Sequence, residues 1–272
     1  MRIALIQMVS GADLPANLRA AREALTQAAG QGADLAVLPE YFCLFGQRDT
    51  DKLAIAEEPG HGPIQSAIAE AAQRLGLAVV AGTLPLRTAD PARVSNTCLV
   101  YGADGDCLAR YDKIHLFRFD NGREAYDESR VLLAGREPVT VDLRTRAGDR
   151  WRVGLSVCYD LRFPELYRRL AADGADLLLA PSAFTHTTGE AHWELLLRAR
   201  AVENLAYLAA AAQGGAHANG RRTWGHSAVI DPWGHILACR DASGPGVVIA
   251  DLSRERLASC RRQLPALEHR VL

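Results

Sequence analysis

The chain has 272 residues, of which 49 % are hydrophobic, so it can bury the core of one large domain or two small ones. Charged residues make up 23 %, and the net charge of −1 argues against a protein that binds nucleic acid without sequence preference. The sequence contains no run of about 18 apolar residues, and its N-terminus lacks a signal-peptide cleavage pattern. These features predict a soluble, cytoplasmic protein that does not bind membranes.

Apolar runs and helical patterns alternate along the chain. The predicted strands are short apolar runs bounded by turn residues: Arg2–Met8, Ala33–Leu38, Leu77–Leu84, Asn96–Tyr101, Cys107–Tyr111, Pro138–Leu143, Trp151–Val157, Ala175–Ala180, Ala206–Gln213, Gly225–Asp231, His235–Cys239 and Gly246–Asp251. The predicted helices are Leu14–Gly30, Gly62–Leu75, Pro164–Ala172, Gly189–Asn204 and a last helix from Ser253 to about Arg262. Residues 118–130 are predicted to form a polar loop. This order predicts a layered α/β fold with a single domain over residues 1–272.

The cysteines indicate free thiols rather than a disulfide scaffold. No two of the six have C-x-x-C spacing, which argues against a structural zinc site as well. Cys43 follows a predicted strand end and is expected either to pack in the core or to be a second pocket thiol.

Cys158 stands at a position suited to chemistry. It ends the apolar run from Val153 and precedes a predicted helix that begins at Pro164. Ligands of open α/β sheets bind outside the carboxyl ends of the strands, and the backbone N–H groups of a following turn lower a thiol pKa. The alternative is a packed, inert cysteine.

Two further polar residues also follow predicted strands. Glu40 comes directly after Val37-Leu38-Pro39, and Lys113 follows the strand that ends near Tyr111. Each has a simpler interpretation when taken alone: Glu40 as a solvated loop carboxylate, and Lys113 as a surface cation paired with Asp112. Because strand ends converge in layered α/β folds, these residues can share one pocket with Cys158.

Three segments around these residues resemble the signature motifs of the nitrilase superfamily of carbon–nitrogen hydrolases. They are Val37–Glu40, Lys113–Phe117 and Cys158–Tyr167, and their order and spacing agree with the superfamily over nearly the whole chain. The resemblance implies a four-layer α-β-β-α sandwich with Glu40, Lys113 and Cys158 as a catalytic triad. It also implies a second glutamate after the lysine, for which Glu128 is the candidate and Glu124 the competitor.

The chemistry expected of these residues needs no metal and no cofactor. Amides are poor electrophiles, so the reaction is divided through a thioester on the cysteine. Glu40 is expected to act as general base and acid, and Lys113 with the backbone N–H of Tyr159 to stabilise the oxyanion. Burial of two carboxylates together is expected to raise the pKa of Glu40 or Glu128.

Motifs in the second half resemble one branch of the superfamily, which holds ω-amidases and deaminated glutathione amidases. They include Pro181–Phe184, Arg198–Glu203 and Trp224–Ser227, and Arg261–Pro265 looks closer to the deaminated glutathione amidases. That family cleaves an amide to 2-oxoglutarate and cysteinylglycine, and ω-amidases release ammonia from 2-oxoglutaramate. The alternatives are an enzyme that hydrolyses N-carbamoyl amino acids or β-ureidopropionate, a true nitrilase, a glutamine amidotransferase and a non-enzymatic interaction protein.

A substrate of this kind carries a carboxylate, which favours an arginine fork in the pocket. Arg162, four residues after Cys158, is the candidate, and its alternative is an ion pair with Asp160 or Glu165. The other candidate substrate-binding residues are Tyr159, Phe184, Thr185 and His186, with Arg118 or Arg123 for a second carboxylate. The resemblance also implies a homodimer or a higher homo-oligomer.

Overall fold

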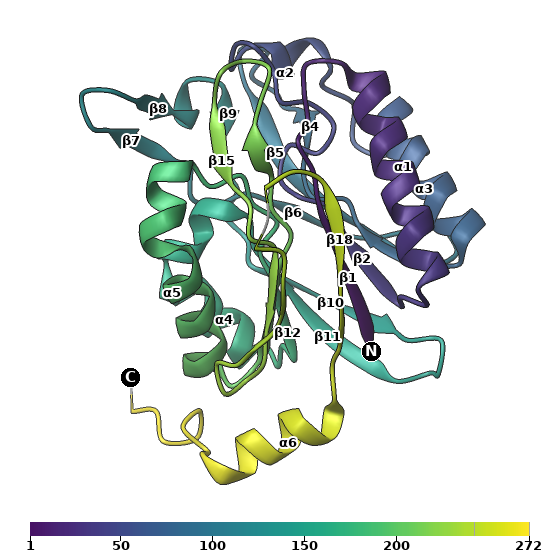
Figure 1. The fold of residues 1–272 in the computed structure, drawn as a ribbon, viewed down its shortest axis with the longest axis vertical. Coiled ribbons are helices and arrows are strands. Elements are labelled where there is room, and N and C mark those ends of the chain that lie inside the picture. Colours follow the sequence, from purple (N-terminus) through teal and green to yellow (C-terminus); the bar gives the residue numbers. More distant parts are fainter. Residues whose placement is uncertain (242, 272) are drawn as a thin grey trace.

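Two β-sheets form the centre of the structure, a computed structural model that describes residues 1–241 and 243–271 (Figure 1). The first sheet has the strand order β18 (Gly246–Asp251), β1 (Arg2–Gln7), β2 (Leu35–Val37), β3 (Ala78–Val80), β5 (Val94–Tyr101) and β4 (Leu84–Arg87), with β6 (Cys107–Asp112) and β9 (Leu132–Leu133) also paired to β5. The second has the order β10 (Val139–Arg144), β11 (Arg150–Leu155), β12 (Leu177–Leu179), β13 (Tyr207–Ala210), β16 (Ala228–Ile230) and β17 (Ile236–Cys239).

Helices cover the outer face of each sheet. In Figure 1, α1 (Leu14–Gly30) and α3 (Pro63–Leu75) lie on one side of the molecule, and α4 (Pro164–Ala172) and α5 (His186–Asn204) lie on the other. The helix α6 (Arg254–Gln263) follows β18 at one end, and the side chain of Ser253 caps it. The predicted α-β-β-α sandwich is therefore confirmed.

Alternation along β1 shows how the layers form. Ile3 and Leu5 belong to the core between the sheets, whereas Ala4 and Ile6 belong to the core under α1 and α3. Successive side chains of a strand point to opposite faces, so a central strand with helices behind it must be apolar on both faces. Within the described residues no helix is long and apolar enough to cross a membrane.

Several short strands and helices of the structure were not predicted from the sequence. The segment Leu77–Leu84, predicted as one strand, contains β3 and the start of β4, because the chain bends at Gly82. This glycine has φ +47°, and a Cβ there would lie 2.0 Å from the carbonyl oxygen of Pro39. A side chain at residue 82 would therefore displace the loop that carries Glu40.

The predicted loop at residues 118–130 holds a small hairpin instead. Its strands are β7 (Arg118–Asp120) and β8 (Ala125–Asp127), and a 3-10 turn, η1 (Glu128–Arg130), follows. Other unpredicted elements are α2 (Asp51–Ala54), β9, and the paired strands β14 (Gly214–Ala216) and β15 (Arg222–Trp224). The helix α5 begins at His186 rather than Gly189, because the side chain of Thr185 accepts a hydrogen bond from the Thr188 N–H and caps it.

Candidate active site

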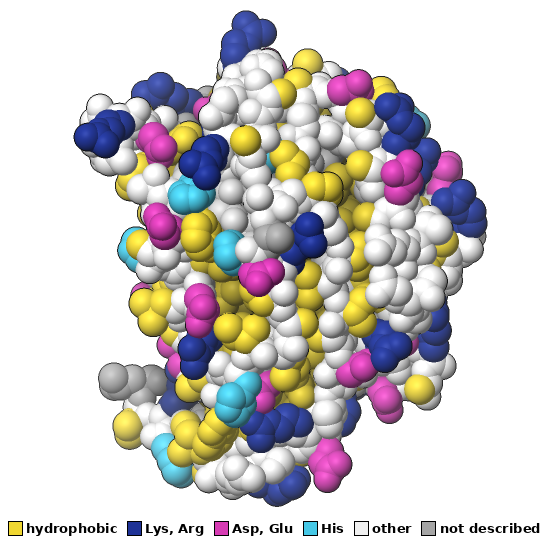
Figure 2. All heavy atoms as spheres, in the orientation of Figure 1, with side chains coloured by type: hydrophobic (Ala, Val, Ile, Leu, Met, Phe, Trp, Pro, Cys, Tyr) yellow, Lys and Arg dark blue, Asp and Glu magenta, His cyan; other side chains and the backbone are white. Residues whose placement is uncertain are grey.

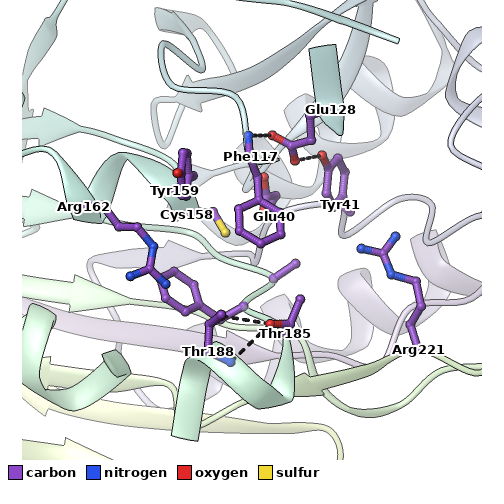
Figure 3. A pocket seen from close by; sticks show the side chains of 12 residues that line it. Glu40, Tyr41, Phe117, Glu128, Cys158, Tyr159, Arg162, Thr185, Thr188 and Arg221 are labelled. Atoms are coloured by element: carbon purple, nitrogen blue, oxygen red, sulfur yellow. Dashed lines mark hydrogen bonds between the residues drawn. The ribbon is translucent and has the colours of Figure 1, made fainter. Parts of the chain in front are cut away.

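Three strand ends bring Glu40, Lys113 and Cys158 together. Glu40 follows β2, Lys113 follows β6, and Cys158 opens the 3-10 turn η2 (Cys158–Arg162) after β11. Glu40 and Cys158 line one pocket, and Lys113 lies buried behind it against the carboxyl group of Glu40. Figure 3 shows the sulfur of Cys158 beside Glu40 at the centre of this pocket.

Lys113 is buried with two carboxylates. Its Nζ lies 2.9 Å from Oε1 of Glu40 and 2.8 Å from Oε2 of Glu128. Lys113 and Glu40 are each 1 % exposed, so neither is a solvated surface residue. Asp112, the alternative partner of Lys113, is paired with Arg110 at 2.9 Å instead. The ammonium group therefore balances charge inside the protein, where partners are needed for any ion.

Glu128, rather than Glu124, is the second glutamate at this position. Its carboxylate also accepts hydrogen bonds from the Tyr41 hydroxyl at 2.7 Å and from the Phe117 N–H at 2.7 Å. Glu124 lies in the turn of the β7–β8 hairpin, where its carboxylate accepts a 3.5 Å hydrogen bond from Thr187. Glu128 thus has every feature of a fixed, ionised partner for Lys113.

The surroundings move the pKa values of the two glutamates in opposite directions. Burial raises the pKa of Glu40, and the charge of Lys113 only partly offsets this. Burial acts on Glu128 too, but the charge of Lys113 and hydrogen bonds from Lys113, Phe117 and Tyr41 outweigh it and lower the Glu128 pKa. Despite its burial, Lys113 has a pKa well above its usual value because of the two carboxylates. Glu40 is therefore the group able to exchange a proton, and Lys113 stays charged.

Cys158 sits on a strained turn. Its φ is +50°, a conformation rare for residues other than glycine, and its N–H donates to the Pro181 carbonyl at 3.0 Å. Burial, and then the charge of Glu40, raise the pKa of the thiol well above its usual value. The expectation that the turn lowers this pKa is therefore wrong, because the net shift is upward. This shift favours the protonated thiol, and Glu40, which lies beside the sulfur in the same pocket, can accept its proton.

Asp160 fixes the turn that carries Cys158. Its carboxylate is fully buried and accepts hydrogen bonds from the Val157 N–H at 2.8 Å and the Tyr111 hydroxyl at 2.6 Å. The backbone N–H of His115 donates to it at 3.0 Å, and the His115 ring contacts it at 2.7 Å through Nδ1. Asp160 therefore ties the cysteine turn to the segment that follows Lys113. His115 belongs to this scaffold, and its ring stacks on Phe163.

Arg162 lies at one side of the pocket (Figure 3). Across residues 1–241 and 243–271 it forms no ion pair with Asp160 or Glu165, and its guanidinium contacts Nδ1 of His192 at 3.2 Å. It lies over the rings of Tyr159 and Phe184, at 5.8 and 5.5 Å from their centroids. The guanidinium is thus oriented while several of its N–H donors stay available.

The remaining sequence-based candidates divide into two groups. Tyr159, Phe184 and Thr185 line the pocket, but His186 does not, because it begins α5 and its ring packs against Trp224. Arg118 and Arg123 are exposed on the β7–β8 hairpin and do not line the pocket either. Both expectations are corrected accordingly.

Cys43 is not a second pocket thiol. It lies in the core with its Sγ 3.8 Å from the Thr83 carbonyl, and burial raises its pKa to about 12. In the part of the chain that the structure describes, no group of three or more histidine, cysteine, aspartate or glutamate side chains could hold a metal ion.

Sequence reasoning missed several pocket residues, which are Tyr41, Phe117, Ala183, Thr188 and Arg221. It also missed Asn96, whose Nδ2 donates to Oε1 of Glu40 at 2.9 Å. Tyr41 directly follows the motif that ends at Glu40, and Phe117 is the last residue of the Lys113–Phe117 motif, so the motifs could have pointed to both residues. Arg221 lies in the turn between β14 and β15, two strands that the sequence did not predict.

A family model described as carbon-nitrogen hydrolase matches residues 2–262. The deaminated glutathione amidase of Synechocystis sp. (strain PCC 6803 / GT-S) is 42 % identical over 271 residues, which cover 98 % of this chain and 97 % of that protein. The omega-amidase NIT2 of Homo sapiens is 37 % identical over 271 residues, covering 99 % and 94 %.

Solved structures share the fold. The C. elegans NitFhit protein superposes with a TM-score of 0.90 at 37 % identity, over 99 % of this chain and 65 % of that one. Saccharomyces cerevisiae Nit3, a member of branch 10 of the nitrilase superfamily, gives a TM-score of 0.86 at 29 % identity, over 97 % of this chain and 94 % of that one.

Proposed function

This chain belongs to the carbon–nitrogen hydrolase family and is an amidase, and we propose that it cleaves deaminated glutathione to 2-oxoglutarate and cysteinylglycine. The observation that carries the proposal is the convergence of Glu40, Lys113 and Cys158 on one pocket that also holds Arg162. The name of the Synechocystis relative favours this substrate. The name of the human relative makes ω-amidase activity on 2-oxoglutaramate the second candidate.

In the first half of the proposed reaction the substrate amide acylates Cys158. Glu40 takes the proton of the thiol as the sulfur attacks the carbonyl carbon. The oxyanion that forms is stabilised by Lys113, which remains protonated, and by the backbone N–H of Tyr159. Glu40 then gives the proton to the nitrogen, the C–N bond breaks, and the amine leaves.

In the second half water attacks the thioester. Glu40 removes a proton from the water, a C–O bond forms, and the C–S bond breaks. The proton returns to the sulfur, so the acid leaves and the starting state is restored. Glu128 holds Lys113 in place through both halves of the reaction. The lowered pKa of Glu128 agrees with this role, because it keeps the carboxylate charged.

Arg162 is proposed to bind the carboxylate of the 2-oxo acid. Replacing it by lysine keeps the charge but removes the planar fork, so we expect KM to rise and kcat/KM to fall by about 10-fold or more for acidic substrates. Steady-state kinetics of Arg162→Lys and the wild type measure this. Unchanged kinetics would place the carboxylate elsewhere.

The acid limb of the pH profile is proposed to report Glu40. The base must be ionised, so activity falls as the pH drops through the Glu40 pKa, which burial raises above 4.5. Asn96 donates to the Glu40 carboxylate and favours its charged form. In Asn96→Leu that pKa rises further, and the midpoint of the acid limb of kcat/KM should move to higher pH. A midpoint that stays or moves down contradicts Glu40 as the base.

The activity is tested by mixing the purified protein with deaminated glutathione in the presence of EDTA. We expect 2-oxoglutarate and cysteinylglycine to appear in equal amounts, detected by a coupled dehydrogenase assay and by mass spectrometry. Without either product the substrate proposal fails, and ammonia release from 2-oxoglutaramate then tests the second candidate.

We further propose that residues 1–272 form one cytoplasmic domain that assembles as a homodimer. The core between the sheets joins residues of both halves of the chain, such as Ile3 and Val153, and all six cysteines are free thiols. On the face shown in Figure 2, hydrophobic side chains gather beside α5. The helix α5 exposes Leu195 and Val202, and the neighbouring segment that runs into β17 exposes Trp233, Ile236 and Leu237. The mass in sedimentation equilibrium should be that of two chains, and a monomer would contradict the proposal.

A further inference from the structure

Arg221 lies across the pocket from Arg162. It comes from the turn between β14 and β15, which is far along the chain from the three strand ends that carry Glu40, Lys113 and Cys158. In the folded protein it nevertheless lines the same pocket. Figure 3 shows the two guanidinium groups on opposite sides of the space in front of Cys158. Because Cys158 lines the same pocket, a substrate bound at the sulfur can extend one end toward Arg162 and the other toward Arg221.

The guanidinium of Arg221 is held in a fixed plane. It lies 5.0 Å from the ring centroid of Phe45 and 4.6 Å from that of Tyr126. The turn beneath it is closed by a hydrogen bond from the Arg221 N–H to Asn219, which in turn donates to the Gly46 carbonyl at 2.7 Å. The group is therefore oriented before any ligand binds, which reduces the entropy lost on binding.

The charge of Arg221 is only partly balanced. Its Nη1 lies 3.7 Å from Oδ1 of Asp49, beyond hydrogen-bond distance, and that carboxylate is half exposed. The same oxygen of Asp49 also contacts Nζ of Lys52 at 3.6 Å. Two cations thus share one carboxylate, which leaves this end of the pocket positive and the fork of Arg221 with unused donors.

We propose that Arg221 binds a second carboxylate of the substrate, on the amine side of the scissile amide. Arg162 holds the acyl side, so the amide bond lies between two anionic ends. The preferred leaving group is therefore an amino acid or a short peptide with a free carboxylate, rather than ammonia. This inference rests on the proposed function and determines which amides the pocket selects.

The test compares three substrates in the wild type and in Arg221→Gln. Deaminated glutathione carries both carboxylates, its C-terminal carboxamide lacks the second, and 2-oxoglutaramate lacks the whole leaving peptide. In Arg221→Gln we expect kcat/KM for deaminated glutathione to fall about 10- to 100-fold, and that for 2-oxoglutaramate to stay within about twofold. The wild type should lose a similar factor on the carboxamide, and Arg221→Gln should add no further loss there.

Two matched variants make the result specific. Arg162→Lys should impair deaminated glutathione and 2-oxoglutaramate alike, whereas Arg123→Gln, on the exposed hairpin, should impair neither. The inference is overturned if Arg221→Gln affects both substrates equally or neither, or if the carboxamide is as good a substrate as the acid. A wild type that turns over none of the three is a different result, because it removes the proposed function and this inference with it.

Discussion

Replacing Cys158 with alanine is expected to lower kcat at least about 10⁴-fold while the protein stays folded. No other described thiol lines the pocket, so nothing can take over the role of the sulfur. The substitution removes one atom from a buried site and leaves the turn anchored by Asp160, so we expect the thermal midpoint to change little. Residual turnover and circular dichroism measure the two effects separately.

Cys43→Ala is the matched control, because Cys43 is also buried, lies close in sequence to Glu40, and stays outside the pocket. It should keep nearly all activity. Retained turnover in Cys158→Ala would contradict the nucleophile assignment outright. Equal losses in both variants would indicate that the sulfur atoms matter for packing only.

Replacing Lys113 with methionine is expected to damage both stability and activity. The change leaves Glu40 and Glu128 buried without a cation, and removing one member of a buried ion pair typically costs about 3–5 kcal/mol. One carboxyl group should then remain protonated at neutral pH. Loss of the cation that is proposed to stabilise the oxyanion should lower kcat by about 10²- to 10³-fold. Chemical denaturation and steady-state kinetics measure the two losses.

A double-mutant cycle separates charge balance from packing. In Lys113→Met with Glu128→Gln, one buried carboxylate is removed together with the ammonium group, so part of the lost stability should return. Activity should not return, because the cation is still missing. Strictly additive losses in stability would contradict the buried ion pair.

Much of the fold could be predicted, because several central strands of the two sheets are apolar on both faces. Such strands stand out as short uninterrupted runs, as Leu35–Val37 and Leu177–Leu179 do. The elements that were missed are short, and their form depends on contacts outside the segment. The β7–β8 hairpin is an example, since its strands have three residues each and are too short for alternation to reveal them.

Some residues of the candidate site could likewise be predicted from the sequence, and others could not. Glu40, Lys113 and Cys158 could be predicted because each follows a recognisable strand within a specific motif. Asn96 is an interior residue of β5, so its bond to Glu40 depends on how β5 and the end of β2 are placed in the sheet. His186 was wrongly predicted as a pocket residue because the start of α5 was placed three residues too late.

The pKa of Cys158 shows the limit of local reasoning. A turn after a strand does supply backbone donors, but burial and the neighbouring charge of Glu40 raise the pKa of the thiol by more than hydrogen bonding lowers it. The direction of the shift can be known only once the distant Glu40 is placed beside the sulfur.

The measurement that tests the central claim most directly is kcat/KM of the wild-type protein on deaminated glutathione and on 2-oxoglutaramate, side by side. The account predicts that both are hydrolysed, with a preference of about 100-fold or more for deaminated glutathione, since only that substrate places a carboxylate at both Arg162 and Arg221. A preference for 2-oxoglutaramate, or no turnover of either, would contradict it.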